Sequence, residues 1–166
     1  MKRLIIVAIM VMLFCVSCQP KNDDSSQVKV SSYAQQLFLD KNPYIGDASA
    51  NGKVLNLLNM AEELGSYSVE LKTDEIPYWI KLNFEEYVSD REAFDLKLLD
   101  KAFLILALIE NANEVQCSYP YIEDGEEILI TLYVTQKQAT DALGKDIKAF
   151  AKSEAGIQTL LNQLTP

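Results

Sequence analysis

Few side chains in this sequence could carry out chemistry, and the types that are missing exclude several mechanisms. The chain contains three cysteines and no histidine. Without histidine, a Ser-His-Asp triad, a Cys-His pair and a histidine-ligated zinc site are excluded. Catalysis would have to rest on carboxylates, Lys, Tyr or a thiol. Adjacent acids such as Glu62-Glu63 and Glu85-Glu86 supply carboxylates, but a glycosidase holds its carboxyl groups about 5–10 Å apart across a cleft, and sequence neighbours do not indicate one.

The cysteine with the clearest predicted chemistry is Cys18. Lys2 and Arg3 precede an apolar run of 13 residues, and Ser17 stands directly before Cys18. This is the charged start, apolar centre and cleavage site of a secretory signal, and the run is shorter than the roughly 20 residues of a transmembrane helix. The segment resembles a bacterial lipoprotein signal, in which the cysteine after the cut is lipidated. We therefore predict a signal peptide over residues 1–17 and a lipid on Cys18, with an ordinary cleaved signal as the alternative.

Charge restricts the partners of the mature chain. The full sequence has 15 Lys and Arg against 24 Asp and Glu, a net charge of -9. Cleavage after residue 17 removes two basic residues and no acid, which leaves a net charge of -11. Such a chain offers no basic field to phosphates, so we expect no nucleic-acid partner. Docking on anionic lipid by charge is disfavoured too, and we expect the lipid to hold the protein on the extracytoplasmic face of a cell membrane.

The mature chain divides into a tether and one domain. Residues 18–31 begin with a polar stretch that lacks periodicity, which predicts a flexible tether. Residues 32–166 contain no repeat and no Pro/Gly-rich linker, which predicts a single domain. Cys117 is the one thiol left, so no intramolecular disulfide is available. Because it alternates with Val115 and Tyr119, we predict that Cys117 is buried and structural.

Hydrophobic spacing predicts the elements of the first part of the domain. We expect a short helix over residues 32–38, and a second helix that begins at Ser49 or Asn51 as its cap and ends at Gly65. Alternation predicts strands over 67–72 and 79–84. A further helix, from residue 90 or 95 to 111, contains eight consecutive apolar residues and must be buried.

Turn and cap signals organise the second part. Strands around residues 115–119 and 128–134 are joined by Asp124-Gly125, a hairpin signal, and the four acids around it lack the spacing of a calcium loop. Thr135 with Gln138 predicts a capping box before a helix that Gly144 ends, and Ser153 caps a terminal helix. Strands joined by hairpins with helices grouped beside them predict an α+β fold, with an antiparallel sheet of about four strands packed against helices.

The most distinctive segment is residues 42–53. Gly46, Gly52 and Lys53 suggest a phosphate loop, but five residues separate the glycines where a Walker A loop has four, and Val54 stands where Mg²⁺ needs a hydroxyl. We therefore predict no nucleotide or other cofactor and no metal site. A small anion at the helix N-terminus that follows remains an alternative.

Three stretches together resemble a known family: NPYIGDAS from residue 42, IPYWIKLNF from residue 76 and AFLILALIEN from residue 102. Their order and spacing are similar to those of domain of unknown function 4825, found in secreted and lipid-anchored proteins of Gram-positive bacteria. The resemblance covers nearly all of residues 35–165. It implies an extracytoplasmic location, no assigned activity and, in some members, linkage to membrane sensor proteins. It implies no catalytic residue.

Three functions remain open at this point. The leading hypothesis is a non-enzymatic binding or sensing module whose partner is a membrane or surface protein. Its predicted binding surface lies on the segment from Pro43 to Lys53. The candidate residues there are Tyr44, Gly46, Asp47 and Lys53, and Trp79 from a neighbouring turn is added to them. Core packing is the alternative for the aromatics, and satisfying its own turn is the alternative for Asp47. A carboxylate-based cell-wall hydrolase is the second hypothesis. A solute-binding lipoprotein is the third, although such proteins close two lobes over a ligand.

Overall fold

The computed structural model describes residues 28–164. The predicted signal peptide, Cys18 and most of the predicted tether lie outside the described residues. The last four residues of that tether, 28–31, are described, and Ser31 is the N-cap of the first helix. Within residues 28–164, no helix combines the length and the apolar character that crossing a membrane requires.

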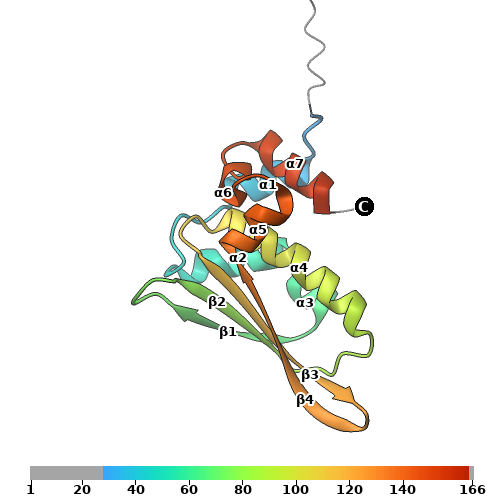
Figure 1. The fold of residues 1–166 in the computed structure, drawn as a ribbon. Helices are drawn as coiled ribbons and strands as arrows, with labels where there is room; N and C mark the ends of the chain where they lie inside the picture. Colours follow the sequence, from blue (N-terminus) through green and yellow to red (C-terminus); the bar gives the residue numbers. More distant parts are fainter. Residues whose placement is uncertain (1–27, 165–166) are drawn as a thin grey trace, which may run out of the picture.

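Seven helices and four strands make up the described part of the chain (Figure 1). In chain order they are α1 (Ser32–Leu39), α2 (Ala48–Leu57), α3 (Met60–Leu64), β1 (Tyr67–Lys72), β2 (Trp79–Phe84), α4 (Arg91–Leu108), β3 (Glu114–Glu123), β4 (Glu126–Thr135), α5 (Gln136–Leu143), α6 (Ile147–Phe150) and α7 (Glu154–Leu164). The α+β fold is confirmed.

The sheet is mixed rather than antiparallel, which corrects the prediction. Its strand order is β1-β2-β3-β4, in which the outer pairs are antiparallel and β2 runs parallel to β3. The reason is α4, which connects β2 to β3. A tight turn reverses the chain, whereas a helix of 18 residues carries it back along the sheet, so that the next strand starts at the same end as the last.

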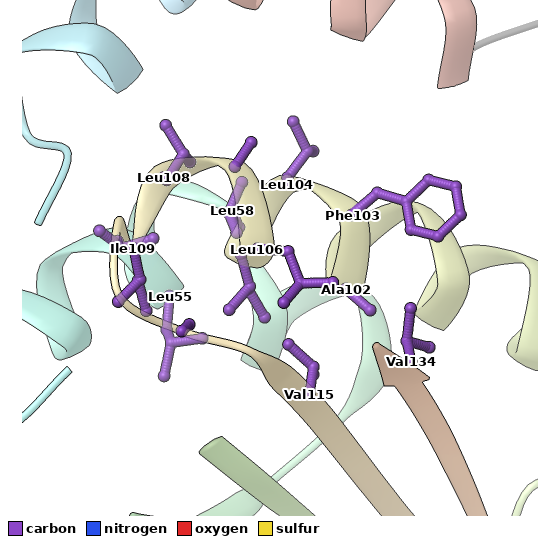
Figure 2. Close-up of a cluster of buried hydrophobic side chains, with 14 of the residues drawn as sticks. Leu55, Leu58, Ala102, Phe103, Leu104, Leu106, Leu108, Ile109, Val115 and Val134 are labelled. Atoms are coloured by element: carbon purple, nitrogen blue, oxygen red, sulfur yellow. The ribbon is translucent and has the colours of Figure 1, made fainter. Parts of the chain in front are cut away.

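The helices gather on one side of this sheet (Figure 1). In β2 the side chains of Ile80, Leu82 and Phe84 are buried, and those between them are only half-buried. We call the side of these buried residues the inner face. The eight apolar residues 102–109 of α4 and its C-cap are all buried, as predicted. Figure 2 shows residues of this run clustered with Leu55 and Leu58 and with Val115 and Val134 of the sheet.

Most cap and turn predictions are confirmed. Thr135 and Gln138 form the capping box of α5, and Gly144 ends that helix in the left-handed region. Asp124 and Gly125 both have positive φ in the β3–β4 turn, as a two-residue hairpin turn requires. Ser153 Oγ accepts a hydrogen bond from the N–H of Gly156 at the start of α7.

The second predicted helix is wrong in two details. Its cap is Asp47, not Ser49 or Asn51, because the Asp47 carboxylate accepts the N–H of Ala50 at 2.9 Å. The helix is also broken into α2 and α3 at Asn59, whose φ of 52° is left-handed. The break turns α3 so that both Leu58 and Met60 reach the core, although neighbouring positions on one straight helix would point apart.

Candidate functional site

A turn locked by buried asparagines precedes α2. Asn42 is nearly fully buried, and Asn51, on the inner side of α2, is 1% exposed. The Asn42 side-chain amide donates to the Asn51 carbonyl oxygen at 2.7 Å and to the Tyr44 backbone carbonyl at 2.9 Å. Asn51 donates in turn to the Ile45 carbonyl at 2.6 Å, and Asn42 accepts the N–H of Tyr44 at 3.0 Å. These bonds fix the path of residues 42–46 from inside.

The turn is also tied to the C-terminal end of α4. Asn111 accepts the N–H of Ile45 at 2.7 Å, and the side chain of Ile45 is fully buried in the core. The backbone of Asn42 accepts the N–H of Glu110 at 2.8 Å and donates to Leu108 at 2.9 Å. The distinctive stretch from residue 42 is therefore integrated into the core and held on both sides.

Tyr44 is the side chain that this turn presents to solvent. It is 57% exposed although its backbone is held by Asn42. Its ring lies over Gly46: a Cβ on Gly46 would stand 2.4 Å from Tyr44 Cε1. Glycine is therefore required at position 46 for the ring to lie flat against the backbone. A side chain whose backbone is already fixed loses less conformational entropy on binding than one on a mobile loop.

The five predicted surface residues do not form one cluster. Tyr44, Gly46 and Asp47 share the turn, where Asp47 caps α2. Lys53 lies farther along α2, beside an open hollow of about 570 Å³ that Tyr33 and Asp40 also line. Trp79 is half-buried on the outer face of β2, where its register partners are Lys72 and Glu114.

The asparagines were missed by sequence reasoning, although one signal was available. Asn51 shares the spacing of the apolar positions Val54, Leu55 and Leu58, which places it on the buried face of α2. A polar residue on such a face must find a buried partner. Asn42 and Asn111 lie in loops, where sequence gives no comparable indication of burial.

The strongly displaced pKa values belong to structural groups. Burial raises the pKa of Cys117 to about 12, and its thiol is 1% exposed. Burial and a hydrogen bond to Asp95 raise the pKa of Tyr119. Burial lowers the pKa of Lys148 to about 8, against the opposing effect of Asp146 and Glu110.

Lys148 is held as a cap on α4 rather than as a free amine. Its ammonium donates to the carbonyl of Leu106, to that of Ile109 at 2.8 Å and to that of Ala112 at 2.7 Å. The last carbonyls of a helix lack intrahelical partners and attract positive charge. All three N–H groups of the ammonium are occupied, which leaves none to activate a substrate.

The paired acids of the hydrolase hypothesis lie on the surface. Glu63 and Glu86, from α3 and from the segment after β2, line one open hollow of about 250 Å³ together with Lys97. Glu63 is ion-paired with Lys101 at 2.8 Å. Within residues 28–164, no group of three acidic or cysteine side chains could hold a metal ion.

Comparison with known families gives one match. The model of a domain of unknown function (DUF4825) matches residues 37–135. The match begins within α1 and ends at the last residue of β4, a narrower stretch than residues 35–165 that the resemblance implied. A search of curated proteins and a search of solved structures gave no match.

Proposed function

Because this chain belongs to the DUF4825 family, whose description assigns no activity, we propose its function from its own geometry: a non-enzymatic binding or sensing module. The observation that carries the proposal is the restrained turn that presents Tyr44. Bonds from Asn42, Asn51 and Asn111 hold the backbone, and Gly46 seats the ring. A turn that only connects two helices does not need this many buried hydrogen bonds. A contact surface does benefit from them, because each bond lowers the conformational entropy that is lost on binding.

The proposed location is the extracytoplasmic face of a cell membrane, with a lipid on Cys18 as the anchor. Support comes from the charged start, the apolar run and Ser17 before the cysteine. Replacement of Cys18 by Ala is expected to release the protein from the membrane fraction and to change its mobility. A variant that stays in the membrane with unchanged mobility would contradict the anchor.

The proposed partner is a membrane or surface protein that contacts Tyr44. Tyrosine is among the residues that contribute most to protein interfaces. Lys53 and Trp79 lie at other places on the surface, so we restrict the proposed contact to Tyr44 and the turn around it. Asp47 contributes to this surface by holding the start of α2 rather than by a contact of its own.

The test is photo-crosslinking on intact membranes from a residue that replaces Tyr44. We expect a specific adduct with a membrane or surface protein, and none from the same crosslinker at Leu96, an exposed position on α4. Gly46→Ala should weaken the binding of that partner, since the added methyl group displaces the ring. Its melting temperature should be nearly unchanged. An adduct pattern that is the same from both positions, or full binding by Gly46→Ala and Tyr44→Ala, would refute the turn as the contact.

A cell-wall hydrolase remains the alternative, since Glu63 and Glu86 come from different elements and line one hollow. Purified protein incubated with cell-wall glycan distinguishes the two functions. The hydrolase would be favoured over the binding module if the protein releases soluble glycan fragments and Glu86→Gln abolishes this release. The exposed control Glu75→Gln should then retain it.

A further inference from the structure

The strand β4 lies at the edge of the sheet, with β3 on one side only. It pairs with β3 over ten residues in one uninterrupted register, from Glu114 opposite Thr135 to Glu123 opposite Glu126. No bulge interrupts this ladder. An unbroken edge of ten residues carries a row of backbone groups that no strand in the described part of the chain satisfies.

The backbone groups on the free side can be identified from the ladder. The N–H of Gln136 donates to Asn113 at 2.8 Å, and antiparallel pairs alternate between bonded and non-bonded. The even-numbered residues of β4 therefore bond to β3, and the odd-numbered ones, from Glu127 to Thr135, direct N–H and C=O to the free side. The same odd-numbered residues carry their side chains on the outer face of the sheet. Leu129 and Thr131, for example, pair with Pro120 and Ser118 of β3, whereas the buried Cys117 pairs with the even-numbered Leu132.

This edge lacks the features that usually prevent strand pairing. Residues 128–135 contain no charge, no proline and no glycine. Two large side chains are exposed on it, Leu129 at 69% and Tyr133 at 56%. Natural edge strands are usually short, bulged, charged or covered by another element. A long, apolar and uncharged edge is instead typical of strands that pair with another chain.

We propose that β4 pairs antiparallel with β4 of a second copy, which joins two sheets into one of eight strands. The two-fold axis passes at Thr131. This register sets Leu129 of each copy opposite Tyr133 of the other, so that the exposed apolar side chains cover each other in cross-strand pairs. The outward N–H and C=O groups from Leu129 to Tyr133 then find partners, whereas the N–H of Thr135 stays bonded to Gln138 of its own chain.

Charge favours a second copy over an unrelated strand. The acids of the strand, Glu126 and Glu127, stand at its start, and Lys137 follows its end with a side chain that is 82% exposed. Antiparallel self-pairing sets the acidic start of each strand at the end of the other, next to the first turn of α5, where Lys137 is held only by an exposed ion pair with Asp141. The net charge of -11 of the mature chain opposes association at long range, but salt at physiological strength screens it beyond about 8 Å.

The test is the association state of residues 18–166 carrying Cys18→Ser, a chain that retains every described element. Sedimentation at increasing concentration should give a monomer–dimer equilibrium. Leu129→Lys should raise the dissociation constant at least about tenfold, which corresponds to 1.4 kcal/mol. The matched control, Leu96→Lys on α4, should leave it unchanged, since Leu96 is comparably exposed.

The register is tested by a single cysteine. Facing residues of a bonded antiparallel pair have Cα atoms about 5.5 Å apart, within the range that a disulfide spans. Thr131→Cys should therefore form a disulfide-linked dimer under mild oxidation, whereas Tyr133→Cys, which faces Leu129, should not. A mature chain that sediments as a monomer up to about 200 μM, or a dimer that Leu129→Lys leaves intact, overturns the proposal. The proposal is also overturned if, on membranes, a different protein rather than a second copy covers the β4 edge.

Discussion

Replacement of Asn51 by Leu tests the asparagine network that holds the Tyr44 turn. Leucine has the branching and the number of non-hydrogen atoms of asparagine but neither donates nor accepts a hydrogen bond. The change leaves two buried partners without their bonds: the side-chain amide of Asn42, at 2.7 Å, and the carbonyl of Ile45, at 2.6 Å. Each buried group that loses its partner costs about 1–3 kcal/mol. We expect a loss of about 3 kcal/mol in the free energy of unfolding.

Urea unfolding of the purified protein measures this loss. For a domain of this size, about 3 kcal/mol also lowers the melting temperature by roughly 10 °C. Asn56→Leu is the matched control, because Asn56 is exposed on the same helix; it should change stability by less than about 0.5 kcal/mol. A double-mutant cycle with Asn42→Ala should give a coupling energy above about 1 kcal/mol. If Asn51→Leu costs less than about 1 kcal/mol, the network does not hold the turn in the way that we describe.

Three further predictions concern single side chains. Asp47→Ala should cost about 1 kcal/mol of stability through loss of the α2 cap, with Asp47→Asn much less affected; equal melting temperatures of Asp47→Ala and the native protein would contradict the capping role. The thiol of Cys117 should react with a thiol reagent at neutral pH at least about a hundredfold more slowly in the native protein than in urea, and similar rates would show that it is accessible. The pKa of Lys148 is lowered to about 8 in the folded protein, from about 10.5 in the unfolded chain. Between pH 8 and pH 10.5 the unfolded chain therefore binds more protons than the folded one, and the contribution of Lys148 to the free energy of unfolding rises with pH. The difference in unfolding free energy between the native protein and Lys148→Met should therefore grow in favour of the native protein from pH 8 to 10.5, and a constant difference would contradict the burial of this charge.

Local signals predicted most elements, because each rests on neighbours in sequence. The capping box at Thr135, the hairpin turn at Asp124 and the buried helix around residues 102–109 all depend on spacings within a few residues. The direction of β3 relative to β2 was mispredicted as antiparallel. The alternation of strand residues is the same in both directions, and only the helical connection fixes the parallel pairing.

The site was less predictable than the fold. The sequence indicated the turn around Gly46 and Tyr44, but not the bonds that hold them. Asn111 lies 66 residues from Ile45 along the chain, and sequence neighbours give no indication that the two meet. Lys148 is a similar case. Its place in a four-residue helix gave no indication that it reaches three carbonyls at the end of α4.

The surroundings of α4 bear on where the folding unit of this family ends. The family match stops at residue 135, yet α4, which is apolar on all sides over residues 102–108, packs against α6 as well as against α2, α3 and the sheet. Residues 37–135 expressed alone would leave one flank of α4 in water and its final carbonyls without Lys148. The segment after residue 135 thus completes the cover of the part that the family match defines, and in this chain the folding unit extends beyond that match.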